Sequence, residues 1–173
     1  METNSMQIED AKLIMVSIRC TVYNHEPYLR DCLEGFIMQK TNFRIEAIVH
    51  DDASTDGSAI IIKEYAEKYP DIIKPIYEVE NQYSKHNGSL ERIMNGACKG
   101  KYIAFCEGDD YWIDPLKLQK QVDFLESNTD YSMSHTNNIC YNQKKRIFVR
   151  DVGERKKEEI GNGLTCEDII KYN

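Results

Sequence analysis

The sequence predicts an α/β fold, a Rossmann-like and mostly parallel sheet flanked by helices. Two observations predict it: short apolar, β-branched runs alternate with segments of helical periodicity, and polar residues suited to turns and helix starts separate them. Strands that alternate with helices of about 10–15 residues imply right-handed crossovers between parallel strands. A chain of 173 residues is long enough for one such domain, and two full domains are not expected.

The first part of the chain predicts two strand–helix units. Residues 14–22 alternate and β-branch as a strand does, and Glu26 followed by Pro27 opens a helix. Residues 44–50 form the second strand, after which the Ser-Thr-Asp run at 54–56 offers N-caps to a second helix. The apolar positions of the two helices are Leu29, Leu33, Phe36, Ile37, Ile61, Ile62, Tyr65 and Tyr69.

The next part predicts further alternation of strands and helices. Residues 72–79 are extended, a third helix ends at Gly100, and residues 101–106 form a short apolar strand. Asp114 and the proline after it are a cap and first-turn signal for a fourth helix, and residues 131–141 form a fifth extended stretch. The apolar positions of these two helices are Leu90, Ile93, Met94, Ala97, Leu118, Val122 and Leu125.

Three segments follow from this pattern. Residues 1–12 are expected to be disordered or poorly ordered, and residues 13–141 form the α/β domain. Residues 142–173 are expected to be a charged loop or hairpin followed by the start of another region, because Thr165 to Asp168 resembles a capping box. The sequence ends about two turns after the start of that helix, so we expect the polypeptide to be a fragment of a longer protein.

The charge balance argues against nucleic acid as a partner. Lys and Arg total 22 while Asp and Glu total 29, so the net charge is −7, and the field of such a chain repels a phosphate backbone. An anionic ligand must therefore be held locally, by helix N-termini, backbone amides, a few cations or a bound metal ion.

Cysteine usage and the N-terminus indicate a cytoplasmic, soluble chain. The six cysteines form no Cys-x-x-Cys pair and several lie in apolar runs, so we expect reduced, mostly packed thiols and no zinc site. The first ten residues are polar and acidic, unlike a signal peptide, and no run of about 18 apolar residues occurs.

An acidic cluster, Glu107-Gly108-Asp109-Asp110, directly follows the strand at 101–106. Clustered carboxylates repel one another unless a cation or a donor neutralises them, so the cluster suggests Mg²⁺ or Mn²⁺ bridging to the phosphates of a ligand. A solvated acidic turn that caps the next helix is the alternative.

A second acidic run, from Asp51 to Ser58, follows the second strand. It resembles an EF-hand loop, but Lys63 occupies the position that needs a bidentate Glu. Either one carboxylate accepts hydrogen bonds from a nucleobase or ribose while the 54–56 run caps the helix, or the whole run is capping.

Polar and aromatic groups also gather at the end of the first strand, at Thr21, Tyr23, Asn24 and Glu26, where a base could rest. The alternative is that Tyr23 is a half-buried aromatic residue without this role. The four histidines have no metal-ligand spacing, and none is assigned a catalytic role.

Three segments in this order resemble the nucleotide-binding half of the family 2 inverting glycosyltransferases, which have the glycosyltransferase-A type of fold. They are VSIRCTVYNHEPYLRDCL at 16–33, IEAIVHDDASTDGS at 45–58 and GACKGKYIAFCEGDDYWIDPLKLQKQVDFLE at 96–126. The resemblance covers roughly residues 13–140 and implies that the 13–141 domain binds a nucleotide sugar.

The resemblance implies roles for matching residues on the nucleoside side. Thr21, Tyr23 and Glu26 would line the nucleotide pocket at the end of the first strand. Asp52, with Asp51 beside it, would contact a uracil-type base or its ribose.

On the metal side, Asp110 would ligate Mn²⁺ or Mg²⁺, and Asp109 would contact the ribose or the metal. Glu107 stands where many members carry the first Asp of their acidic motif, and its role is left open. Members often place a basic residue near the diphosphate, for which Lys85 or Arg92 could serve.

The implied function is metal-dependent transfer, with inversion, of a sugar from a nucleoside-diphosphate sugar, a UDP-sugar being favoured. The acceptor would be a glycan or a lipid-linked glycan, and peripheral membrane association would reside mostly in a missing C-terminal part. The family's catalytic base lies well downstream of the metal motif, so we expect it beyond Asn173, because Glu167 and Asp168 have the context of a helix start. The chain should then bind donor better than it turns it over.

Other nucleotide-binding functions lack their motifs in this sequence. A sugar-phosphate nucleotidyltransferase needs a glycine-rich phosphate loop after the first strand, and residues 21–24 contain no glycine. Neither the dinucleotide-binding nor the P-loop motif occurs. A catalytically inert nucleotide-binding or interaction module is the alternative that remains open.

Overall fold

The computed structural model describes residues 13–136, 139–142 and 145–150. The predictions for residues 1–12, and for the helix start at Thr165, lie outside the described residues. The chain forms two compact units, the first ending at Ser127 and the second beginning at Asn128. No helix in the described ranges has the length and apolar character needed to cross a membrane.

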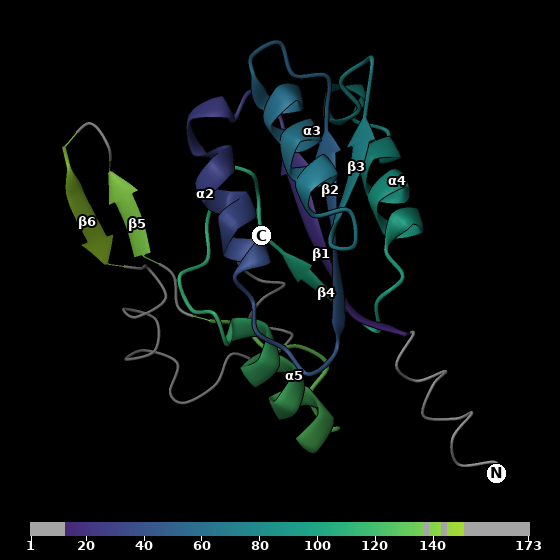
Figure 1. Cartoon of the computed structure of the whole chain (residues 1–173), viewed down its shortest axis with the longest axis vertical. Coiled ribbons are helices and arrows are strands. Elements are labelled where there is room, and N and C mark those ends of the chain that lie inside the picture. The colour runs from purple at the N-terminus through teal and green to yellow at the C-terminus, as the bar shows by residue number, and fades with distance from the viewer. Residues whose placement is uncertain (1–12, 137–138, 143–144, 151–173) are drawn as a thin grey trace. The chain divides into compact units, whose positions relative to one another are not determined.

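The first unit is built on a four-stranded sheet with the order β3-β2-β1-β4, in which every neighbouring pair is parallel. Figure 1 shows the four strands side by side. This confirms the predicted parallel sheet. The strands are β1 (Ile14–Val22), β2 (Arg44–Asp51), β3 (Ile73–Tyr77) and β4 (Tyr102–Phe105).

Helices pack on both faces of the sheet, as predicted. One face of β1 and β2 is covered by the apolar sides of α2, α3 and α5 around Ile18 and Val49, and Figure 1 shows α2 and α3 on this face. The opposite face of β2 is covered by α4 around Ile48. The helices are α2 (Glu26–Ile37), α3 (Ser58–Lys68), α4 (Ser89–Ala97) and α5 (Lys117–Ser127), with a short 3₁₀ helix η1 (Tyr83–Lys85) before α4.

Two predicted elements differ from the structure. The helix expected to start at Pro115 begins at Lys117, because Asp114 closes a turn first: its Oδ1 accepts the N–H of Leu116 at 2.9 Å and its carbonyl accepts the N–H of Lys117 at 3.1 Å. The fifth extended stretch is a strand only at its end. In the second unit, β5 (Ile139–Asn142) pairs antiparallel with β6 (Ile147–Arg150), so these residues form a hairpin.

A buried polar network fixes the chain where it enters β4. Ser17 Oγ on β1 donates to Glu46 Oε1 on β2 at 2.7 Å and accepts the N–H of Gly100 at 2.7 Å. The N–H of Lys99 also reaches Glu46 Oε1, at 2.9 Å. A Cβ on Gly100 would overlap the backbone of Val16 and Ser17, so the strand can approach β1 this closely only with glycine there.

Gly100→Ala should therefore destabilise the protein by about 1–3 kcal/mol or more, because the atoms that its Cβ meets belong to a paired strand and cannot move aside. Urea unfolding measures the change. Gly96→Ala is the matched control: Gly96 lies in α4 with open space around its Cα, and alanine should stabilise that helix by about 0.5–1 kcal/mol. Equal effects of the two substitutions would contradict the packing described at Gly100.

Candidate functional site

The carboxyl end of β1 holds both acidic loops through consecutive carbonyl groups. The carbonyl of Thr21 accepts the N–H of Gly108 at 3.0 Å, and the carbonyl of Val22 accepts the N–H of Asp52 at 2.8 Å. Successive carbonyls of a strand point to opposite sides, so the loop after β2 and the loop after β4 flank β1. The structure thus brings the three predicted motifs to one edge of the sheet.

The acidic cluster forms a tight turn in which the N–H of Asp110 donates to the carbonyl of Glu107 at 3.0 Å. Asp109 and Asp110 are exposed, and neither carboxylate accepts a hydrogen bond from, or forms an ion pair with, another described residue. Burial of the carboxyl and the neighbouring charge of Asp109 raise the pKa of Asp110, against a smaller opposite effect of His25. The turn therefore places two carboxylates that repel each other where a cation would relieve the repulsion.

The loop after β1 carries the other predicted nucleotide-binding residues. Thr21 is half-buried and the Tyr23 side chain is 48% exposed. Glu26 is occupied within the protein: its Oε2 accepts the N–H of Gly57 at 2.8 Å, and its own N–H donates to Asp56 Oδ2 at 3.0 Å. Glu26 thus joins the first loop to the second.

Further hydrogen bonds between these two loops correct the predicted caps of α3. Ser54 Oγ accepts the N–H of Asn24 at 2.9 Å, and Asn24 Oδ1 accepts the N–H of Thr55 at 2.8 Å. Asn24 has a φ of 57°, a left-handed conformation that asparagine tolerates. Of residues 54–56, Asp56 is the one whose side chain bonds to the first residue of the helix: its Oδ1 accepts the N–H of Ser58 at 2.9 Å. The prediction that Ser54 and Thr55 cap α3 is wrong, because both residues form hydrogen bonds with Asn24 instead.

The adjacent aspartates after β2 have different environments, although both are only 3% exposed. Asp52 Oδ1 accepts the N–H of Gln82 at 2.6 Å, and its Oδ2 accepts the N–H of Tyr83 at 3.0 Å, so this carboxylate caps η1. Asp51 Oδ1 has no hydrogen-bond partner among the described residues. Asp51 Oδ1 is therefore a buried acceptor that no described protein donor engages.

The two basic candidates bond within their own segment of the chain. Lys85 Nζ donates to Gln82 Oε1 at 3.1 Å and pairs with Glu80 Oε2 at 3.1 Å. Arg92 Nη1 donates to the carbonyl of Asn87 at 2.8 Å. Their proposed proximity to a diphosphate stays a prediction.

His25 was not assigned a role from the sequence, yet it lies against the acidic turn. A Cβ on Gly108 would lie 2.8 Å from His25 Nδ1, and this ring nitrogen is buried with no hydrogen-bond partner among the described residues. The signal available in the sequence was its position, three residues after the end of the strand at 14–22, where polar groups gather.

Three cysteines lie buried near the same turn: Cys20, Cys32 and Cys106. The hydrogen bond with Cys32, followed by burial, raises the pKa of the Cys106 thiol. The contact with Cys106 lowers the pKa of Cys32, but the bond with Cys20 and burial outweigh it, so that pKa is raised as well. Both thiols therefore favour the protonated form at neutral pH, and the burial of these three cysteines agrees with the predicted packing.

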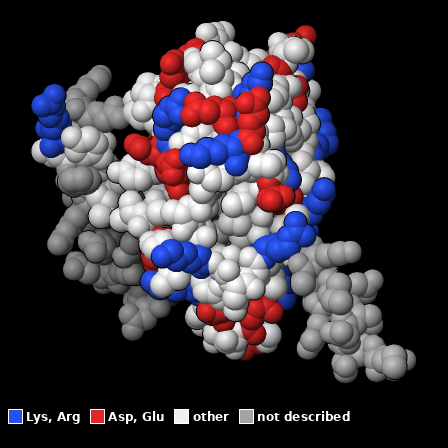
Figure 2. Space-filling view, in the orientation of Figure 1, with Lys and Arg blue, Asp and Glu red and all other residues white. Residues whose placement is uncertain are grey.

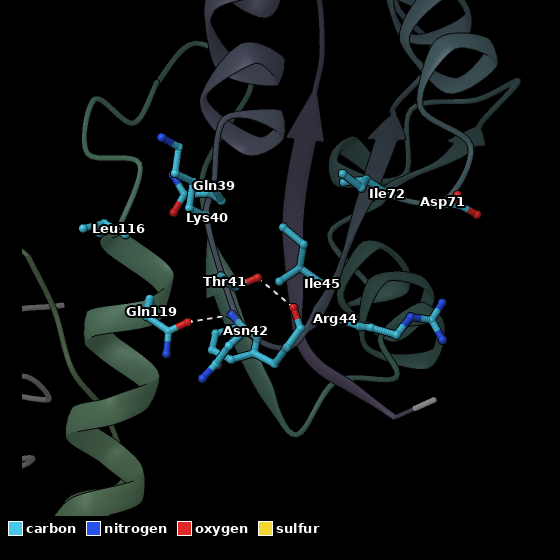
Figure 3. A pocket seen from close by; sticks show the side chains of 11 residues that line it. Gln39, Lys40, Thr41, Asn42, Arg44, Ile45, Asp71, Ile72, Leu116 and Gln119 are labelled. Carbon is cyan, nitrogen blue, oxygen red and sulfur yellow. Dashed lines mark hydrogen bonds between the residues drawn. The ribbon is translucent and has the colours of Figure 1, made fainter. Parts of the chain in front are cut away.

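A separate cavity of about 980 Å³ lies at the amino ends of the strands, away from the acidic loops. Figure 3 shows its lining, which comes from the segment between α2 and β2, the start of β2, the residues just before β3 and the start of α5. Asn42 donates its N–H to Gln119 Oε1 at 2.8 Å across it. The cavity contains none of the predicted site residues.

The described residues do not by themselves supply a complete set of metal ligands at the site. Figure 2 shows acidic and basic side chains mixed over α2 and α3 on the face in view. Within the described residues, no three His, Cys, Asp or Glu side chains converge as a complete metal site. A cation at Asp109 and Asp110 would therefore need further ligands from the bound molecule or from water.

The profile of the family described as Glycosyl transferase family 2 matches residues 17–168. An uncharacterised protein of Mycobacterium tuberculosis is 41% identical over 133 residues, which cover 77% of this chain and 36% of that protein. TuaG of Bacillus subtilis, described as a candidate glycosyltransferase of teichuronic acid biosynthesis, is 34% identical over 64% of this chain and 42% of its own length. The chain thus spans less than half the length of these curated relatives.

Two solved structures have a similar fold. S. aureus TarS in complex with UDP superposes with a TM-score of 0.57 and 25% identity, over 67% of this chain and 33% of that chain. A mannosyltransferase from Pyrobaculum calidifontis, in complex with GDP-Man and Mn²⁺, superposes with a TM-score of 0.56 and 25% identity, over 69% of this chain and 35% of that chain.

Asp52→Asn should destabilise the protein by about 1–3 kcal/mol, because the amide offers one acceptor oxygen to two backbone donors and leaves one of them unsatisfied. Urea unfolding at neutral pH measures the loss. Asp51→Asn is the control, since it changes an equally buried carboxylate whose Oδ1 has no partner. A loss as large at Asp51 as at Asp52 would refute the capping role.

Asp110→Asn should stabilise the metal-free protein at neutral pH. Folding raises the pKa of Asp110, so the ionised carboxylate is less favourable in the folded state than in the unfolded state. The free energy of unfolding therefore falls as the pH rises above about 4, the ordinary pKa of an aspartate. The site is exposed, so the gain should not exceed about 0.5 kcal/mol. Unfolding in EDTA from pH 3 to pH 7 tests it: the two proteins should differ only at the higher pH, and a less stable variant at pH 7 would contradict the assignment.

Proposed function

We propose that this chain, which belongs to the family 2 glycosyltransferases and has their glycosyltransferase-A type of fold, is the nucleotide-sugar-binding part of a metal-dependent, inverting transferase. The observation that carries the proposal is the turn at 107–110. It is anchored to β1 and presents Asp109 and Asp110 with oxygen atoms that no described residue engages. Three other carboxylates at this edge, those of Glu26, Asp52 and Asp56, accept backbone N–H groups and hold the loops in place.

A nucleoside-diphosphate sugar is the donor that fits this edge. Structural neighbours were solved with UDP and with GDP-Man and Mn²⁺, which supports the donor class. We favour a UDP-sugar. Tyr23, whose ring is exposed, would meet the nucleoside, and Asp52, with Asp51 beside it, would lie next to the base or ribose at the end of β2.

The residues at the turn fit a divalent cation, Mn²⁺ or Mg²⁺. Asp110 would ligate it with Asp109 beside it. The cation would offset both the burial of the Asp110 carboxylate, which is the larger cause of its raised pKa, and its repulsion by Asp109. Bound there with the diphosphate, such an ion supplies Lewis-acid stabilisation of the charge on the leaving nucleoside diphosphate. This would also explain how a chain with a net charge of −7 holds an anion.

The protein's own contribution is orientation. The hydrogen bonds that join Asn24 and Glu26 to the loop after β2 fix that loop, where the nucleoside would bind, with respect to β1. The hydrogen bond from the N–H of Gly108 to the carbonyl of Thr21 fixes the turn at 107–110, where the cation would bind. A carboxylate base would deprotonate the acceptor hydroxyl. The hydroxyl oxygen would then attack the anomeric carbon from the side opposite the leaving nucleoside diphosphate and invert the configuration of that carbon.

We place that base beyond Asn173, in an acceptor-binding part that this chain does not include. The chain spans 36% and 42% of two relatives, which supports the interpretation as a fragment. The acceptor would be a glycan or a lipid-linked glycan of a surface polysaccharide, in line with the teichuronic acid assignment of TuaG. The protein would act in the cytoplasm, with peripheral membrane contact through its remaining part.

Calorimetry of the chain with UDP and with GDP, each with and without Mn²⁺, tests the donor site. Mn²⁺ should strengthen UDP binding, and Asp110→Asn should weaken binding in Mn²⁺ by on the order of tenfold, about 1.4 kcal/mol. Asp123→Asn is the matched control because Asp123 lies on α5 and bonds only to Gln119 among the described residues. Nucleotide binding that ignores both Mn²⁺ and the Asp110 substitution would overturn the metal role.

Turnover by the longer parent protein separates the enzyme from an inert binding module. The full-length protein should transfer or hydrolyse a UDP-sugar in Mn²⁺, and Asp110→Asn should abolish most of that activity. The 173-residue chain alone should bind UDP without turning over the sugar. Full activity of the short chain would disprove the location of the base.

A further inference from the structure

The acidic turn rests on a cluster of three buried thiols. Cys20 on β1 and Cys32 on α2 are fully buried, and Cys106, at the end of β4, is 5% exposed. The Sγ atoms of Cys20 and Cys32 are 3.9 Å apart. Strand β1, helix α2 and the residue directly after β4 thus each place a sulfur atom under the turn.

Two of these thiols donate hydrogen bonds to the backbone of the turn. Cys32 Sγ lies 3.4 Å from the carbonyl oxygen of Glu107. Cys106 Sγ lies 3.8 Å from that oxygen and 3.8 Å from the carbonyl oxygen of Asp110, so its single proton serves one of them at a time. These carbonyls belong to the first and last residues of the turn, on either side of the two candidate metal ligands.

Helix α2 and the residues just after it hold the chain that follows the turn as well. Trp112 packs its backbone on Gly35, and its ring contacts Phe36 edge-to-face with centroids 5.1 Å apart. Gln39 Nε2 donates to the carbonyl of Asp114 at 3.0 Å. Along α2, Cys32 is the position that reaches the acidic turn itself.

We propose that Cys32 is a positioning residue: its thiol holds the Glu107 carbonyl so that the turn keeps Asp109 and Asp110 in the arrangement that binds a divalent cation. The inference rests on the proposed function of the same site. Cys32 acts through the backbone of the turn and touches neither the cation nor the nucleotide. Cys106 supports it from the position directly after β4, whereas the Cys20 thiol bonds to the Cys32 thiol and to no carbonyl of the turn among the described residues.

The matched variants are Cys32→Ala, Cys32→Ser and Cys20→Ala. Both alanine variants remove an equally buried sulfur and should lower the unfolding temperature by similar amounts. Only Cys32→Ala should weaken Mn²⁺-dependent UDP binding, by about three- to tenfold, the range expected for one neutral hydrogen bond. Cys32→Ser keeps a donor and should bind within about twofold of wild type, since a hydroxyl replaces the thiol.

Amide hydrogen exchange gives a second measurement that needs no nucleotide. The Asp110 N–H, which donates to the Glu107 carbonyl, should exchange faster in Cys32→Ala and at the wild-type rate in Cys20→Ala. If wild type binds UDP with Mn²⁺ and the two alanine variants bind it equally well, the positioning role is wrong and the proposed function stands. If wild type shows no Mn²⁺-dependent binding, both fail.

Discussion

The candidate site depends on the backbone of a single strand end. The carbonyls of Thr21 and Val22 point to opposite sides of β1, and each binds the loop that follows a neighbouring strand. Gly108 and Asp52 therefore lie about one strand spacing from β1, roughly 4.8 Å, on its two sides. The side chains of the site do not create this proximity. Parallel pairing creates it, and the acidic residues occupy the positions that pairing brings together.

The two pairs of adjacent aspartates look alike in sequence and differ in the structure. Asp52 is held by two backbone N–H groups from the segment 82–83, which lies thirty residues further along the chain. Asp109 and Asp110 have no such donors in the described part of the chain. A local pattern can therefore predict that acids gather at this edge, but it cannot tell a carboxylate that holds a loop from one that is available to a ligand.

The difference between local sequence patterns and long-range contacts also explains which elements could be predicted. The strand at 14–22 and the strand at 44–50 were found within one residue, because alternation and buried apolar runs are local properties. The stretch at 131–141 has extended character too, yet only Ile139–Asn142 is a strand, and its partner is β6 rather than the main sheet. The local sequence predicts that a segment is extended. It does not predict which strand the segment pairs with, because pairing depends on packing against distant parts of the chain.

Helix α2 gives the two sides of the site a common support. Its first residue, Glu26, holds the loop at Gly57, and its seventh, Cys32, holds the turn at Glu107. Twelve residues of helix form a rigid body about 18 Å long, so the two loops are ordered by the same element. A nucleoside at one loop and a cation at the other would then bind to a single preorganised frame, and the conformational entropy of ordering it is lost on folding rather than at each binding step.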